Sequence, residues 1–130
     1  MTDSPGLPDR EPDIRTIAPP SQTNPGGTVF GGWLMGMLDS AASAPALARA
    51  RGPVVTAAVD RLRFHRPIRA GEQVSIYAQL RDGRRGRMVI EVAAYSRRLS
   101  RPETVHRVAS GQMVFMAVDG EGRPRPLPDE

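Results

Sequence analysis

Residues 23–33 read TNPGGTVFGGW, and a run with helical character follows from about Gly31 to Ala50. Four glycines in the quoted stretch would let another molecule come close to the backbone at the helix start. Backbone N–H groups at a helix N-terminus have no intrahelical acceptor, so they attract negative or developing negative charge. The stretch therefore predicts a helix whose start can hold an oxyanion.

The predicted helix is marked by its apolar period. Apolar residues recur close to every 3.6 positions, at Leu34, Leu38, Ala41 and Ala48. The high alanine content supports a helix, and Gly52-Pro53 would stop it. Pro45 lies inside the run, and we expect it to kink the helix or to end its regular hydrogen bonding.

After Pro53 the apolar period changes from that of a helix to that of a strand. Strands are predicted at residues 13–17, 55–59, 74–80, 88–95 and 105–118. Asp82-Gly83 is expected to begin a turn that includes residues 84–87. One short strand, one long helix and four further strands predict an α+β fold, an antiparallel sheet with a helix on one face.

The composition is that of one small domain. The chain has 130 residues and no cysteine, so it can bury a real core but cannot form disulfides or thiolate metal sites. Its two histidines, His65 and His106, are too few for most metal sites. No apolar run is long enough to span a membrane, and no signal peptide is visible, which favours a cytoplasmic protein. Residues 1–12 are rich in proline and acid, and we expect them to be disordered.

The charge of the chain is carried by arginine. The net charge is +4, and all 18 basic residues are arginines. A GC-rich genome explains the use of arginine in place of lysine. The excess of positive charge also favours an anionic partner, either a phosphorylated ligand or nucleic acid. A nucleic-acid binder would need a clustered basic patch with stacking aromatics, and aromatic residues are only 5% of this chain. We therefore rank nucleic acid last among the partners.

Asp39 is the one acid in the predicted helix. At about 100° per residue, Gly32, Gly36 and Ser43 fall within about 60° of it on the helix surface. Such small residues would leave a groove for a slender substrate, or they would let the helix pack closely on the sheet or on a partner helix. A buried carboxylate without partners is costly, which favours the groove.

A carboxylate in a groove beside a glycine-rich helix start suggests acyl chemistry. Asp39 would act as general base or nucleophile, and the helix start would supply N–H donors to the oxyanion. Asn24 would position a water molecule or the carbonyl group. The chain has neither a G-x-S-x-G motif nor a cysteine nucleophile, so an ester or thioester hydrolase built on Asp39 is the reading that these residues favour.

The chain resembles the YciA-like acyl-CoA thioesterases of the hotdog-fold superfamily over roughly Ile14 to Pro128. The segments that carry the resemblance include Arg15-Thr16-Ile17-Ala18, Thr23-Asn24, Phe30-Gly31-Gly32-Trp33-Leu34-Met35, Asp39, Val54-Val55-Thr56, Arg66-Pro67, Tyr77-Ala78-Gln79 and Ala117-Val118-Asp119. The resemblance implies a single hotdog domain over residues 13–128, in which an antiparallel sheet wraps around one long central helix. It also implies homodimers with a continuous sheet, which assemble as three dimers into a hexamer.

The resemblance further implies a site at the dimer interface with residues from both chains. In it, Asp39 is the catalytic carboxylate, Asn24 acts across the interface, and the backbone at Gly31 and Gly32 binds the thioester carbonyl. Arg66, Arg97 and Arg98 are implied as contacts to the phosphates of coenzyme A. No separate cofactor is implied, because coenzyme A is part of the substrate.

The chain departs from the family pattern after Asp39 and at residues 84–87, and His65 stands where an apolar residue is common. Ser40-Ala41-Ala42 follows Asp39 where the family usually has a glycine pair, and with Pro45 it would reshape the acyl tunnel. Residues 84–87, Arg-Arg-Gly-Arg, replace a small polar turn, which either removes the usual contacts to the nucleotide end or replaces them with arginine–phosphate pairs.

Two activities remain open at this point. In an acyl-CoA thioesterase, Asp39 would activate water or attack the thioester to form an anhydride, and the residues do not separate these mechanisms. A non-catalytic acyl-CoA-binding module on the same fold is the alternative. Such a module would need neither Asp39 nor Asn24, which favours the enzyme.

Overall fold

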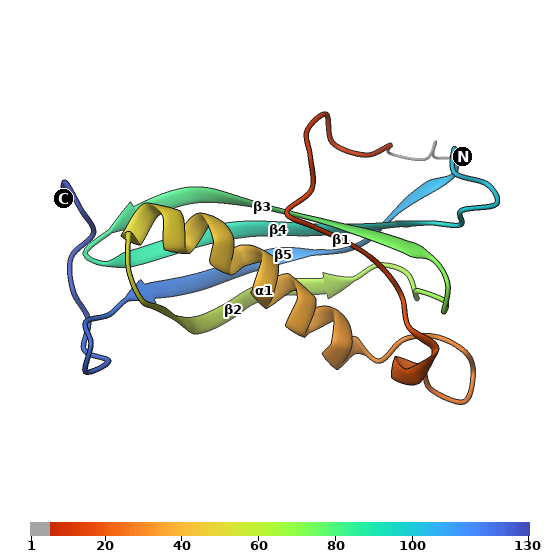
Figure 1. Cartoon of the computed structure of the whole chain (residues 1–130), viewed down its shortest axis with the longest axis horizontal. Coiled ribbons are helices and arrows are strands. Elements are labelled where there is room, and N and C mark those ends of the chain that lie inside the picture. The colour runs from red at the N-terminus through yellow and green to blue at the C-terminus, as the bar shows by residue number, and fades with distance from the viewer. Residues whose placement is uncertain (1–5) are drawn as a thin grey trace.

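The computed structural model describes residues 6–130, which form one α-helix and one five-stranded sheet (Figure 1). The elements are β1 (Ile14–Ile17), α1 (Gly31–Ala50), β2 (Val54–Phe64), β3 (Gln73–Arg84), β4 (Arg87–Arg97) and β5 (Val105–Ala117), with a 3₁₀ turn at Pro20–Gln22. The strand order is β1-β3-β4-β5-β2, every pairing is antiparallel, and α1 lies across one face of the sheet. The predicted α+β fold is confirmed. Of the segment 1–12 that we expect to be disordered, residues 1–5 lie outside the described residues.

The helix begins and ends where the sequence predicts. Phe30, just before it, is extended (φ −64°, ψ 139°), and Arg51, just after it, adopts the left-handed conformation (φ 53°). The buried side chains of α1 are Leu34, Leu38, Ala41, Ala42, Ala46 and Ala50. The prediction that Ala48 belongs to this apolar face is wrong, because Ala48 is exposed.

Pro45 does not end the helix, which contradicts one of the two effects expected of it. The helix continues for five residues beyond it, to Ala50. Proline removes one backbone hydrogen bond in a helix interior. Here Ala46 and Ala50 are fully buried beyond the proline, so packing on the sheet holds the last turn in place.

The core lies between α1 and the sheet. With residues of β5, it includes alternate residues of two other inner strands, Val74, Ile76 and Ala78 from β3 and Met88, Ile90, Val92 and Ala94 from β4. Successive strand residues point to opposite faces, so this alternation places one side of each strand under the helix. The predicted period-two pattern of both strands is therefore confirmed.

The turn between β3 and β4 lies two residues later than predicted. Strand β3 runs through Asp82-Gly83 to Arg84, and the turn is made by Arg85 (φ 54°) and Gly86 (φ 77°). Two positive φ angles are the signature of the tight hairpin turn that matches the twist of the strands. Gly83 serves packing instead, because a Cβ there would lie 3.1 Å from the Leu127 side chain.

Strand β2 is an edge strand and is longer than predicted. Its pairing with β5 shifts register between Thr56 and Ala58 and again between Asp60 and Arg63. The large apolar side chains of Val55, Val59 and Phe64 are 47%, 43% and 49% exposed. Long edge strands with apolar side chains are usually covered by a partner.

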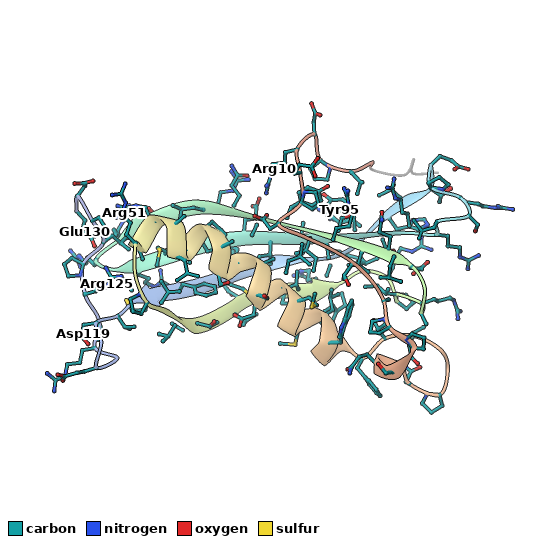
Figure 2. The ribbon with its side chains drawn as sticks, viewed as in Figure 1. Arg10, Arg51, Tyr95, Asp119, Arg125 and Glu130 are labelled. Atoms are coloured by element: carbon teal, nitrogen blue, oxygen red, sulfur yellow. The ribbon has the colours of Figure 1, made fainter. Side chains whose placement is uncertain are left out.

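The C-terminal segment, residues 118–130, closes the end of the sheet where α1 ends (Figure 2). The Arg125 guanidinium donates to the carbonyl oxygens of Val118 (2.7 Å) and Ala50 (3.0 Å). The Glu130 carboxylate accepts hydrogen bonds from the N–H groups of the turn residues Arg85 and Gly86. The segment thus joins the helix C-terminus to the β3–β4 hairpin.

Glu130 makes the stability of this closure depend on pH. The hydrogen bond from the Leu127 N–H, with those from Gly86 and Arg85, holds the pKa of the Glu130 carboxyl below its usual value. Because the pKa is lower in the folded state, ionised Glu130 stabilises the fold above its unfolded pKa, and this contribution is lost as pH falls through the folded pKa.

We therefore expect Glu130→Gln to lower the Tm near neutral pH, and the Tm difference from wild type to shrink as pH falls from about 7 to about 3. Thermal scans followed by circular dichroism measure both. Glu121→Gln is the control, because Glu121 is an exposed acid of the same segment whose one ion pair among residues 6–130 is with Arg123. A Tm difference that stays constant over this pH range would contradict the expectation.

Candidate active site

Asp39 is held in place by a residue that the site prediction missed. The Thr56 hydroxyl of β2 donates a hydrogen bond of 2.6 Å to Asp39 Oδ1. Within residues 6–130, Asp39 Oδ2 accepts no hydrogen bond, so one carboxylate oxygen is oriented and the other is available to a substrate or water. Nothing in the spacing of the sequence links residues 39 and 56, although Val54-Val55-Thr56 is one of the segments that carry the resemblance.

The helix surface beside Asp39 is open. Gly32 and Gly36 are exposed, and a Cβ added at either would meet nothing within 4 Å. These glycines therefore do not serve packing on the sheet of their own chain, which leaves a substrate groove or close packing on a partner helix as explanations for the small-residue stripe. Ser43 donates to the Ser40 carbonyl at 2.6 Å, within the helix.

The helix start has unused donors and a cavity beside it. In the described chain, the N–H groups of Gly31 and Gly32 donate no hydrogen bond, whereas the next N–H, that of Trp33, donates to Phe30 O at 3.1 Å. The cavity has a volume of about 310 Å³ and is lined by Val29, Phe30, Gly31, Leu34, Phe64, His65, Arg66, Pro67 and Ile68. His65 is fixed at this cavity by a 2.8 Å hydrogen bond between its Nε2 and Ser110 Oγ.

Asn24 shapes the loop that leads into the helix. Its side-chain nitrogen donates to Thr28 Oγ1 at 2.9 Å, and its side-chain oxygen accepts from the Thr28 N–H at 3.2 Å. Both polar ends of Asn24 are thus engaged within its own loop. Among the described residues, no hydrogen bond joins Asn24 to Asp39, so one chain alone does not bring these two predicted site residues into contact.

Two of the three arginines predicted to bind phosphate line one cavity, and the third does not. A second cavity of about 340 Å³ is lined by Arg66, Pro67, Arg69, Glu72, Ser96, Arg98, Arg101, Thr104 and His106. Glu72 lies 3.9 Å from the Arg98 guanidinium and is the only acid among these lining residues. Arg97 instead donates to Gln73 Oε1 (2.9 Å) and to Pro102 O (3.4 Å).

The two cavities are neighbours, because Arg66 and Pro67 line both. A ligand with an anionic end and an apolar arm can therefore extend from the arginines towards the helix start. In the part of the chain that the structure describes, no three His, Cys, Asp or Glu side chains are grouped to hold a metal ion. Within the same residues, α1 lacks the apolar length that a membrane-spanning helix needs.

Comparison with known proteins finds relatives of this chain. Residues 26–101 match the sequence profile of the thioesterase superfamily. An uncharacterized acyl-CoA thioester hydrolase of Zymomonas mobilis is 44% identical over 124 residues, 95% of this chain and 83% of that protein. The acyl-CoA thioester hydrolase YciA of Escherichia coli is 33% identical over 132 residues, which cover all of both chains.

A solved structure is similar over nearly the whole chain. It is that of a hexameric hotdog fold thioesterase of Campylobacter jejuni, with a TM-score of 0.86 and 29% identity over 92% of each chain. The predicted resemblance and the hotdog fold are thereby confirmed. The single helix packed on a five-stranded antiparallel sheet, the matching profile and the full-length relatives together show that this chain belongs to the thioesterase superfamily.

Proposed function

We propose that the protein hydrolyses acyl-CoA thioesters to a free acid and coenzyme A, with Asp39 as general base or nucleophile. The observation that carries the proposal is the Asp39 carboxylate, oriented by Thr56 on an open, glycine-lined helix surface. The names of the relatives from Zymomonas mobilis and Escherichia coli support acyl-CoA as the substrate.

The chemistry needs one base or nucleophile and one oxyanion hole. In the general-base route, Asp39 takes a proton from water as the oxygen adds to the thioester carbonyl carbon. Backbone N–H groups at Gly31 and Gly32 stabilise the negative oxygen of the tetrahedral intermediate. The carbon–sulfur bond then breaks, and the thiolate of coenzyme A leaves. In the alternative route Asp39 attacks the carbon itself, and water hydrolyses the resulting anhydride.

One chain cannot supply both parts of this site. Gly32 and Asp39 are seven residues apart on α1, which is about 10 Å along the helix axis at about 1.5 Å per residue. A reacting carbonyl group must lie about 3 Å from the oxyanion donors and within reach of the base, either directly or through one bound water. We therefore propose that the helix start of a second chain faces Asp39, and that Asn24 of that chain belongs to the same site.

The exposed edge of the sheet offers the means to bring two chains together. Among the residues that the structure describes, strand β2 is unpaired on one side, and it carries Thr56 as well as exposed apolar side chains. Pairing of two β2 edges would continue the sheet and bury Val55 and Val59. We propose such a homodimer, and three of them in a hexamer, in keeping with the hexameric relative of Campylobacter jejuni.

The two adjoining cavities of one chain form the surface along which we propose that coenzyme A binds. Its phosphates would bind in the cavity lined by Arg66 and Arg98, because guanidinium groups form paired hydrogen bonds with phosphate oxygens. Its pantetheine arm would follow the adjoining apolar cavity to the helix start at Gly31. Arg97 stays a predicted phosphate contact that this path does not use.

The proposal is tested by thiol release from a panel of short, long and aromatic acyl-CoAs. We expect turnover of at least one class, with equal amounts of acid and coenzyme A formed. If the protein binds acyl-CoA but releases thiol no faster than buffer does, it is the non-catalytic binding module instead. If it neither binds nor hydrolyses any member of the panel, the proposed substrate class is wrong.

We expect Thr56→Val to lower kcat by about tenfold with little change in KM, because valine keeps the shape of the side chain but leaves the Asp39 carboxylate without its hydrogen bond. Thr56→Ser, which keeps the hydroxyl, is expected to recover most of the rate. Steady-state kinetics on one acyl-CoA measure both variants. Equal rates for the valine and serine variants would show that the hydrogen bond does not orient Asp39.

We expect Arg66→Gln together with Arg98→Gln to raise KM for acyl-CoA by about tenfold and to leave kcat within about twofold, because the phosphates lie far from the reacting carbon. Arg97→Gln is the matched comparison from the adjacent position. If it raises KM as much as the double change does, Arg97 belongs to the phosphate site as well.

A further inference from the structure

The cavity beside the helix start is lined mainly by apolar side chains, and His65 is a polar exception. In the part of the chain that the structure describes, only His65 and Arg66 bring polar side chains to this cavity of about 310 Å³. Arg66 also lines the neighbouring arginine cavity, where the proposed function uses it to bind phosphate. The proposed path of coenzyme A gives no role to His65, which stands where an apolar residue is common.

Strand β5 holds His65 in one position at the cavity. The His65 N–H donates to Val108 O at 2.7 Å, and His65 Nε2 lies 2.8 Å from Ser110 Oγ. Val108 is fully buried and Ser110 is half-buried, so both partners are fixed parts of the sheet. The imidazole ring is therefore oriented before a ligand binds, and an oriented side chain loses little conformational freedom on binding.

Only one ring nitrogen of His65 is engaged by the chain. Within residues 6–130, Nδ1 takes part in no hydrogen bond, and the residue is exposed. The two ring nitrogens point in different directions, so Nδ1 does not face Ser110. A serine hydroxyl can donate or accept, and the tautomer of the ring follows from that choice. Nδ1 can therefore accept a hydrogen bond from an amide N–H or donate one to an amide carbonyl.

We propose that His65 Nδ1 forms a hydrogen bond with an amide group of the pantetheine arm, so that His65 is a specificity-determining residue. This rests on the proposed function, because it uses the path of coenzyme A through the cavity. The pantetheine arm carries two amide groups between its phosphate and its sulfur. An amide that enters an apolar cavity loses its water and needs a new partner, which His65 supplies.

His65 lies between the groups that would hold the two ends of the arm. Its sequence neighbour Arg66 lines the cavity proposed for the phosphates, and Gly31 of the proposed carbonyl site lines the same cavity as His65. An arm that joins these two ends must pass through the cavity that His65 lines. The contact therefore favours ligands with an amide-containing arm over ligands that carry phosphates alone.

The test is calorimetric titration of the full-length protein with coenzyme A and with ADP, which carries phosphates but no arm. His65→Leu is expected to weaken coenzyme A binding by about fivefold to tenfold and to leave ADP binding unchanged.

Two further variants separate the ligand contact from the contact with Ser110. Asparagine at position 65 places its amide near the position of Nδ1, whereas glutamine places its amide near that of Nε2. We expect His65→Asn to recover most of the affinity for coenzyme A and His65→Gln to recover little. A side chain whose only role is to bond Ser110 would give the reverse order.

Hydrolysis provides a second readout on the same proteins. His65→Leu should raise KM for acyl-CoA by the same factor and leave kcat within about twofold, because the arm is bound equally in the ground state and the transition state. Unchanged coenzyme A affinity in His65→Leu, an equal loss of ADP binding, or recovery by glutamine instead of asparagine overturns the proposal.

Failure of the proposed function gives a different result. The wild-type protein would then bind coenzyme A in a manner that depends on His65, as proposed here, without releasing thiol from any acyl-CoA. Thiol release by a wild-type protein whose coenzyme A affinity does not depend on His65 overturns only the role of His65. A wild-type protein that binds no coenzyme A overturns both.

Discussion

Replacing Asp39 by asparagine is expected to lower kcat for acyl-CoA hydrolysis by about 10²- to 10⁴-fold, with KM nearly unchanged. The amide oxygen of asparagine still accepts the hydrogen bond from Thr56, so the local structure is kept. The amide can neither take a proton from water nor form an anhydride, so both routes to the acid fail. Thiol release from a good substrate measures the effect.

The matched control is Asp60→Asn. Asp60 is an exposed acid on β2, and its only ion pair is a 3.9 Å contact with Arg61 within the described chain. It should keep wild-type turnover. If Asp39→Asn keeps wild-type turnover while correctly folded, Asp39 is not the catalytic carboxylate.

The second large effect concerns stability. Gly86 has a φ of 77°, and a Cβ there would lie only 2.2 Å from the carbonyl oxygen of Arg125. Gly86→Ala must therefore distort the turn and push the C-terminal segment away. We expect it to lower the free energy of unfolding by about 3 kcal/mol or more, measured by urea denaturation.

Gly122→Ala separates strain from steric overlap. Gly122 has a similar φ of 82°, but a Cβ there would meet nothing within 4 Å. It should therefore show only the cost of the left-handed backbone, about 1 kcal/mol. Equal losses in the two variants would mean that the contact between the hairpin and Arg125 does not matter to stability.

The sequence predicts the helix well and the edge of the sheet poorly. Gly31 to Ala50 is recognisable because a glycine-rich entrance, an apolar period and a stop signal agree. The prediction ends strand β2 at residue 59, whereas the strand continues to Phe64. The apolar alternation on which the prediction rests is interrupted by the register shift after Asp60 and by the positive φ of Arg61. The β3–β4 turn begins after Asp82-Gly83 because the positive φ angles fall at Arg85 and Gly86, and the Leu127 side chain lies beside Gly83.

The candidate site also has residues that the sequence predicts and residues that it does not. Asp39 stands out in the sequence because it is the one acid in a helix whose only other charged residue is Arg49. Thr56 does not, because its contact with Asp39 depends on how the helix lies across the edge strand. Arg97 and Arg98 look equivalent in sequence, yet neighbouring residues at a strand end point in opposite directions, and only Arg98 lines the cavity of Arg66.

The shared site is the central claim, and mixed oligomers test it most directly. One variant is Asp39→Asn, and the other is Gly31→Pro, which removes an oxyanion N–H. Proline fits there, because Gly31 is the first helical residue and Phe30 before it is extended. Loss of one such donor typically costs about 10²–10³ in kcat.

The two variants are co-expressed with different tags, and native mass spectrometry establishes that mixed dimers form. In a mixed dimer, the Asp39 of the proline variant faces the intact helix start of the asparagine variant, so one of its two sites is complete. With half of the dimers mixed, thiol release should recover to about a quarter of the wild-type rate. Mixed dimers that are no more active than either variant alone would contradict a site built from two chains.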